Sequence, residues 1–140
     1  MKKLWILPIG LVVAIIAAAL FAGCSLPQTK TSVDDCINNF MSDLNSSDRS
    51  NVYTNLDSTS LMYSQVKTAT YWNSIFPTGY TYTLSNKSTS GSTVTATLSS
   101  SYTLYSSGVP ITFIMSTDLN GNAVIHSITI STSTSLTVYQ

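Results

Sequence analysis

The stretch from Tyr80 to Ser131 alternates apolar side chains with threonine and serine, and two turn signals divide it. Asn120-Gly121 predicts a two-residue hairpin with Leu119 opposite Asn122, because both turn positions tolerate a positive φ. The pairs counted outward from that turn are Met115 with His126, Phe113 with Ile128 and Ile111 with Ile130. This register keeps the apolar residues of both strands largely on one face, as a half-buried sheet requires.

Ser107-Gly108 predicts a second hairpin in the same stretch. Its pairs are Leu104 with Ile111, Tyr102 with Phe113 and Ser100 with Met115. A first strand, Tyr80 to Asn86, is added by matching Tyr80, Tyr82 and Leu84 to Leu98, Ala96 and Val94. The polar run Lys87 to Gly91 is then a loop, and Thr132 to Gln140 either prolongs the last strand or pairs at an edge. The result is a meander of four antiparallel strands.

Helices are predicted before the strands. Thr31 or Ser32 begins the first helix, with Asp34 and Asp35 in its first turn, where carboxylates favour the exposed amide hydrogens. Apolar residues then recur at helical spacing, at Val33, Cys36, Ile37, Phe40, Met41 and Leu44. Val52, Tyr53 and Leu56 indicate a short second helix that ends near Asp57. Thr59 to Phe76 is a third, broken helical stretch, which Pro77 to Gly79 ends.

Helices laid on one face of a curved four-stranded antiparallel meander make an α+β domain. The order of a long helix, a short helix after the turn at Asp48, a third helix bearing Trp72 and Phe76, and then a meander resembles the cystatin-like or nuclear-transport-factor-two-like fold over residues 31–131. That resemblance implies a pocket between the helices and the concave sheet. Several members of the family are enzymes with an inward His or Asp, and this sequence has no matching acid–base pair.

The chain begins with a basic Met1-Lys2-Lys3 and an apolar run from Leu4 to Ala22, followed by Gly23-Cys24. This segment resembles the signal peptide and lipobox of prokaryotic lipoproteins, in which cleavage occurs before an acylated cysteine. The resemblance implies that Cys24 carries the lipid, although Phe21 stands where leucine is usual. An uncleaved membrane anchor is the alternative, because the apolar run approaches the roughly 20 residues that span a bilayer. Both interpretations place the remaining chain outside the cytoplasm.

The predicted organisation is a signal peptide at 1–23, a tether at 24–30 and a single domain at 31–140. After Gly23 the chain contains four basic residues, six aspartates and no glutamate. No nucleic-acid partner is expected, because no basic stripe exists to neutralise phosphates. If Cys24 is acylated, Cys36 is the only thiol and no disulfide can form.

His126 is the only histidine, and its predicted phase places it on the apolar face. The candidate pocket residues are His126, Ser100, Tyr102, Met115 and Trp72. A base or ligand-orienting donor is one interpretation of His126. The other is a core-edge histidine bonded to Ser100 or backbone, because no carboxylate lies in phase to orient it. The aromatic set Tyr80, Tyr82, Tyr102, Phe113, Trp72 and Phe76 either lines a ligand site or forms core.

No cofactor or metal is expected. Asp118 to Asn122 resembles a calcium loop, but its glycine comes too early and no glutamate closes it, so a hairpin is predicted. Cys36 lies on the apolar helix face without a second cysteine and is predicted to act as a small hydrophobe. The opposite sheet face is rich in threonine and serine, interrupted by Ile114 and Ile125.

Three functions remain open. The first is a non-catalytic, lipid-anchored extracytoplasmic domain that binds a small apolar or amphipathic ligand or a partner protein. The second is an enzyme of the same fold that uses His126, with Ser100 or a tyrosine, for proton transfer. The third is a surface interaction protein that uses the hydroxyl-rich sheet face. A cavity touching His126 is the feature that the first two require.

Overall fold

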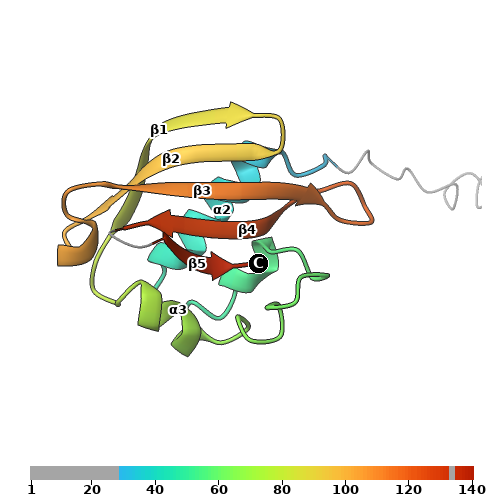
Figure 1. Ribbon diagram of the computed structural model, residues 1–140. Coiled ribbons are helices and arrows are strands. Elements are labelled where there is room, and N and C mark those ends of the chain that lie inside the picture. The colour runs from blue at the N-terminus through green and yellow to red at the C-terminus, as the bar shows by residue number, and fades with distance from the viewer. Residues whose placement is uncertain (1–28, 133–134) are drawn as a thin grey trace, which may run out of the picture.

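The computed structural model describes residues 29–132 and 135–140, which form one five-stranded antiparallel sheet with helix α2 across one face (Figure 1). The elements are α2 (Val33–Asn45), the 3₁₀ helix η1 (Val52–Asn55), α3 (Ala69–Ile75), β1 (Tyr82–Ser90), β2 (Thr93–Ser100), the 3₁₀ helix η2 (Thr103–Tyr105), β3 (Val109–Thr117), β4 (Ala123–Ser131) and β5 (Ser135–Tyr139). The strands lie side by side in chain order, so the meander and the α+β class are confirmed. The predicted number of four strands is wrong.

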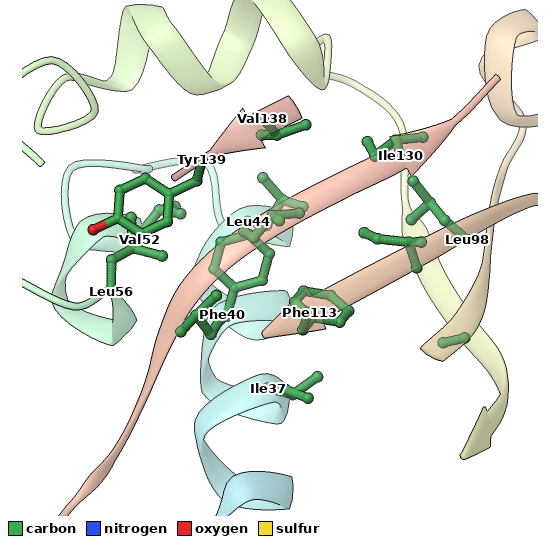
Figure 2. Packing of buried hydrophobic residues seen from close by; sticks show 14 of the residues in the cluster. Ile37, Phe40, Leu44, Val52, Leu56, Leu98, Phe113, Ile130, Val138 and Tyr139 are labelled. Atoms are coloured by element: carbon green, nitrogen blue, oxygen red, sulfur yellow. The ribbon is translucent and has the colours of Figure 1, made fainter. Parts of the chain in front are cut away.

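The fifth strand exists because the end of the chain carries two large apolar side chains. Strand β5 pairs with β4 at the edge of the sheet, which is one of the two predicted alternatives. Val138 and Tyr139 are both fully buried. In Figure 2 the ring of Tyr139 lies beside Leu56 from the helical half, and its hydroxyl group donates to the backbone oxygen of the next residue, Asp57.

Helix α2 begins and packs as its sequence predicts. The Ser32 hydroxyl oxygen accepts a hydrogen bond from the backbone N–H of Asp35 at 3.1 Å, which caps the first turn. Four residues of the predicted apolar face are buried, and two more pack against them. They are Cys36, Ile37, Phe40 and Leu44, then Val33 and Met41.

The helical stretch predicted from Thr59 to Phe76 is mostly irregular. Only its last part forms α3, which Thr68 caps by accepting from the N–H of Tyr71. The earlier residues form successive turns, and Leu61, expected on an apolar face, is 93% exposed. At the start of this stretch the Asp57 carboxylate accepts hydrogen bonds from the N–H and hydroxyl of Thr59 and closes a local turn, and no helix follows from it before Ala69.

Two one-residue offsets determine the register of β3 and β4. The turn holds three residues rather than two, because the N–H of Asp118 bonds to Asn122 O and Gly121 adopts a φ of +79°. A bulge at His126 then shifts the pairing back, so that Met115 pairs with Ile125. The predicted pairs Phe113–Ile128 and Ile111–Ile130 are therefore confirmed, whereas Met115–His126 is wrong.

The predicted register of β2 on β3 is also wrong. Val94 lies opposite Phe113 and Ala96 opposite Ile111, so the pairs Tyr102–Phe113, Leu104–Ile111 and Ser100–Met115 do not form. Residues 101–108 instead fold back through η2. Tyr105 explains this choice, since its ring is fully buried and its hydroxyl donates to Ile75 O at 2.9 Å. Burying this aromatic residue under α3 replaces further strand pairing.

Strand β1 is longer than predicted and pairs in a different register. Leu84 lies opposite Leu98 and Tyr82 opposite Ser100. The strand continues to Ser90, so the loop predicted at Lys87 to Gly91 is wrong. Gly91 and Ser92 form the turn, and Gly91 has a φ of +58°, which suits glycine.

The space between helices and sheet is filled by aromatic rings. Phe40 packs edge-on against both Trp72 and Phe113, with ring centroids 5.5 Å and 6.1 Å apart. Figure 2 shows Phe40 and Phe113 meeting between α2 and β3.

The sequence predicts Ile114 and Ile125 on the opposite, hydroxyl-rich face of the sheet. Ile114 is half-buried there, but Ile125 is fully buried, so the prediction for Ile125 is wrong. The bulge at His126 is the reason, because it turns Ile125 inward.

Candidate functional site

The five residues predicted to line an inner pocket are not gathered into one. Ser100 ends β2 opposite Tyr82, Tyr102 packs against Tyr80 with the two rings tilted, and Trp72 lies in the aromatic core. Met115 is buried opposite Ile125. Three surface pockets of the described residues have volumes from about 300 to about 520 Å³, and none of the five lines any of them.

His126 occupies the bulge in β4 and points away from the core. Its side chain is 48% exposed, and its Nδ1 atom lies 2.9 Å from Oδ2 of Asp57. The predicted inward position of His126 beside Met115 is therefore wrong. So is the expectation that no carboxylate orients it, since the carboxylate comes from the helical half of the chain and not from the sheet.

Asp57 is held ionised by the groups around it. Burial opposes its charge, but hydrogen bonds from His126 and from the hydroxyl and N–H of Thr59 outweigh burial and hold the pKa of Asp57 below its usual value. A carboxylate only accepts hydrogen bonds, so Nδ1 of His126 carries the proton that is shared with it. In the neutral imidazole, Nε2 is then the basic nitrogen.

The backbone of Asp57 is as firmly held as its side chain. Its N–H donates to Ile125 O at 2.8 Å, and Leu56 forms a parallel bridge with Ile125. Its carbonyl oxygen accepts from the Tyr139 hydroxyl and from the N–H of Ser60. The end of η1 is thus tied to β4 and β5, which positions the carboxylate beside the bulge.

A surface groove opens next to Asp57. We call it the Asp57 groove, and its volume is about 450 Å³, within the range of small-ligand sites. It lies between the chain after η1 and the β3–β4 hairpin. Its lining residues are Thr54, Leu56, Asp57, Ser58, Thr59, Tyr63, Ser116, Thr117, Asp118, Leu119, Asn120 and Val124. The lining combines apolar side chains, hydroxyl groups and two carboxylates, and it contains no basic residue.

The other predicted sites have structural roles. Asp118 accepts hydrogen bonds from the N–H groups of Asn120 and Asn122, as the hairpin interpretation requires, and bonds with Asn122 keep the pKa of Asp118 below its usual value. Burial raises the pKa of Cys36 to about 11, so its thiol is protonated at neutral pH. Among residues 29–132 and 135–140, no group of three or more His, Cys, Asp or Glu is placed to hold a metal ion.

The predicted lipidation site Cys24 and the apolar run before it lie outside the described residues. Within the part of the chain that the structure describes, no helix is long and apolar enough to cross a membrane. Comparison with models of known protein families found no match. No curated protein and no solved structure matches the chain either.

Proposed function

We propose that this chain is a lipid-anchored extracytoplasmic domain that binds a small amphipathic ligand, non-catalytically, in the Asp57 groove. The observation that carries the proposal is the groove itself, with about 450 Å³ of space beside a rigidly held carboxylate. The aromatic interior of the domain is filled, so binding at the surface replaces the inner pocket expected from the sequence.

The lining of the groove selects the class of ligand. Leu56, Val124 and Tyr63 supply apolar contact on one side. Asp57 and Asp118 supply negative charge, and the lining itself contains no lysine, arginine or histidine, although His126 contacts Asp57 from outside it and Lys67 lies over the Tyr63 ring. An apolar ligand that bears a cationic amine therefore fits better than one that bears a carboxylate.

The test uses matched probes on the full chain in detergent micelles. Hexylamine, hexanol and hexanoate share one apolar tail and differ in charge. We expect hexylamine to shift the amide resonances of Ser58, Thr117 and Asn120 saturably, hexanol to do so more weakly and hexanoate to have no effect. Equal shifts from all three, or none from hexylamine, contradict the proposal.

A variant pair shows whether the groove is the site. Thr117 and Thr95 are both exposed strand threonines, and only Thr117 lines the groove. Thr117→Tyr should obstruct the groove and abolish the hexylamine shifts, whereas Thr95→Tyr should leave them unchanged. Loss of binding in both variants would place the site elsewhere.

The membrane anchor is tested separately. Mass spectrometry of the membrane fraction should find a diacylated N-terminal peptide beginning at Cys24. Cys24→Ala should release the chain from the membrane, and Cys36→Ala, the matched control, should not. An intact Met1 in the mature chain contradicts lipidation and favours the uncleaved anchor.

A second candidate function is acid–base catalysis at His126. The hydrogen bond from Nδ1 to Asp57 orients the imidazole and leaves Nε2 as the basic nitrogen, an arrangement that suits activation of a water molecule for hydrolysis. The full chain should then hydrolyse p-nitrophenyl acetate faster than the His126→Gln and Asp57→Asn chains. Equal rates for all three chains would exclude this function.

We also propose that the domain has the cystatin-like or nuclear-transport-factor-two-like fold. It is supported by the element order and by α2 lying across the sheet. The fifth strand is an addition to the four-stranded meander expected of that family. An experimental structure with α2 on the other face of the sheet would overturn it.

A further inference from the structure

Arg49 is the one buried basic residue of the described chain, and its side chain joins the ends of two helices. It is 3% exposed, and its Nε–H donates to Leu44 O at 2.6 Å, in the last turn of α2. Its Nη1 donates to Asn73 Oδ1 at 3.1 Å and to the backbone oxygen of Phe76, the residue that ends α3. Carbonyl groups at helix C-termini carry partial negative charge, which explains why a cation is placed there.

These contacts leave part of the guanidinium group unused. Among the described residues, Nη2 of Arg49 has no hydrogen-bond partner, and no carboxylate lies within 4 Å of the group. Nη2 is not among the fully buried side-chain atoms that lack a partner in the described part, and Arg49 lines a surface pocket. Asp48, the adjacent acidic residue, instead accepts from the N–H of Ser50.

The surface that Arg49 reaches is a pocket of about 520 Å³. We call it the Arg49 pocket, and its lining residues are Asn45, Ser46, Ser47, Arg49, Thr78, Gly79, Tyr80 and Thr81. Hydroxyl groups and one cation line it, and no acidic residue does. It lies at the end of the sheet where β1 begins at Tyr82, opposite the end that carries the Asp57 groove.

We propose that the Arg49 pocket binds a small oxyanion, with Nη2 of Arg49 and the surrounding hydroxyl groups as donors. A permanently charged guanidinium group donates strong, charge-assisted hydrogen bonds to carboxylate, phosphate or sulfate oxygens, and Nη2 carries the two N–H groups that the contacts within the chain leave unused. The anion supplies the countercharge that the protein itself does not place beside Arg49. The hydrogen bonds to Leu44, Asn73 and Phe76 already hold the Arg49 side chain in position, so anion binding costs little additional side-chain entropy.

The experiment titrates the full chain in detergent micelles with sodium sulfate, inorganic phosphate and acetate, against sodium chloride at equal ionic strength. We expect saturable shifts of the amides of Ser47 and Thr78 to Thr81 with at least one oxyanion and not with chloride. Preference for sulfate and phosphate indicates a tetrahedral ligand, and preference for acetate indicates a carboxylate. Shifts that chloride reproduces, or no saturable shift at all, overturn the proposal.

A matched pair of variants avoids disturbing Arg49 itself. Ser47 is exposed and lines the pocket. Ser47→Asp places a tethered carboxylate there and should abolish the oxyanion shifts, whereas the neutral Ser47→Asn should retain them. Arg49→Lys, checked for folding by circular dichroism, should weaken binding about tenfold, because lysine keeps the charge and loses the Nη2 donors. Binding to Ser47→Asp that equals binding to the unaltered chain contradicts the assignment.

Discussion

Asp57 and His126 are separated by 69 positions in the chain and are joined by a 2.9 Å contact between Oδ2 and Nδ1. Each residue reaches that contact through an irregularity. Asp57 follows the 3₁₀ helix η1, where its N–H bonds to β4, and His126 is the extra residue of a bulge in β4. The contact joins the helical half of the domain to the sheet.

Asp57→Asn should destabilise the domain by about 2 kcal/mol, since it weakens hydrogen bonds to a charged, nearly buried acceptor. The ordinary pKa of this carboxyl group is 3.8 and the folded value is lower. Its stabilising effect is therefore complete above pH 3.8 and is lost as the pH falls through the folded pKa. Urea unfolding from pH 7 to pH 2 should show a smaller acid-dependent loss in the variant. Asp34→Asn, on an exposed pair with Lys87, should change stability by less than about 1 kcal/mol.

Deletion of His126 should be tolerated. The deletion removes the bulge and leaves Ile125 opposite Met115 and Ile128 opposite Phe113. We expect a cooperative thermal transition and a loss of about 2 kcal/mol from the missing contact with Asp57. Deletion of Thr129 is the control, because it turns Ile130 toward the outer face and should prevent folding. Equal damage from the two deletions would contradict the assignment of the bulge.

Arg49→Met should lower the free energy of unfolding by about 3 kcal/mol. Methionine keeps much of the apolar stem but leaves the carbonyl oxygens of Leu44 and Phe76 without a donor. Urea denaturation measures the loss. Lys87→Met removes a surface ion pair and should cost less than about 1 kcal/mol. Similar losses for the two variants would show that Arg49 does not hold the helix ends.

Cys36 should react with a thiol reagent only when the domain opens. Its side chain is 1% exposed, and burial raises its pKa to about 11. In a Cys24→Ala background, where Cys36 is the only cysteine, we expect very slow labelling at pH 8 and rapid labelling in urea. An added Ser64→Cys change, at an exposed position, should give rapid labelling of the folded chain. Rapid native labelling of Cys36 would show that α2 is not docked.

The first helix was predictable because its signals are local. Ser32, Asp35 and the spacing of Cys36, Ile37 and Phe40 lie within three turns, and the structure uses all of them. The register of β1 and β2 was not predictable in the same way. Tyr102 and Val94 both fit a half-buried strand, and only the burial of Tyr105 against Ile75 decides which of them faces Phe113.

The candidate site was missed for a related reason. The sequence pattern indicates Asp57 only as the end of a short helix, and a straight count from the turn predicts His126 on the inner face. The count gives the observed pairs Phe113–Ile128 and Ile111–Ile130, because the three-residue turn and the bulge shift the register by one residue in opposite directions. It gives the wrong position for His126, which lies in the bulge. Arg49 gave no signal in the sequence, because the carbonyl groups that it bonds become neighbours only after folding.

Sequence alone determined the α+β class, the face that α2 buries, and the outer pairs of β3 and β4. Each of these depends on periodicity and on residues close together along the chain. Only the tertiary structure decided the fifth strand, the contact of Asp57 with His126 and the burial of Arg49. These features depend on which distant backbone groups still need a hydrogen-bond partner once the core has closed, and a linear pattern of side chains does not contain that information.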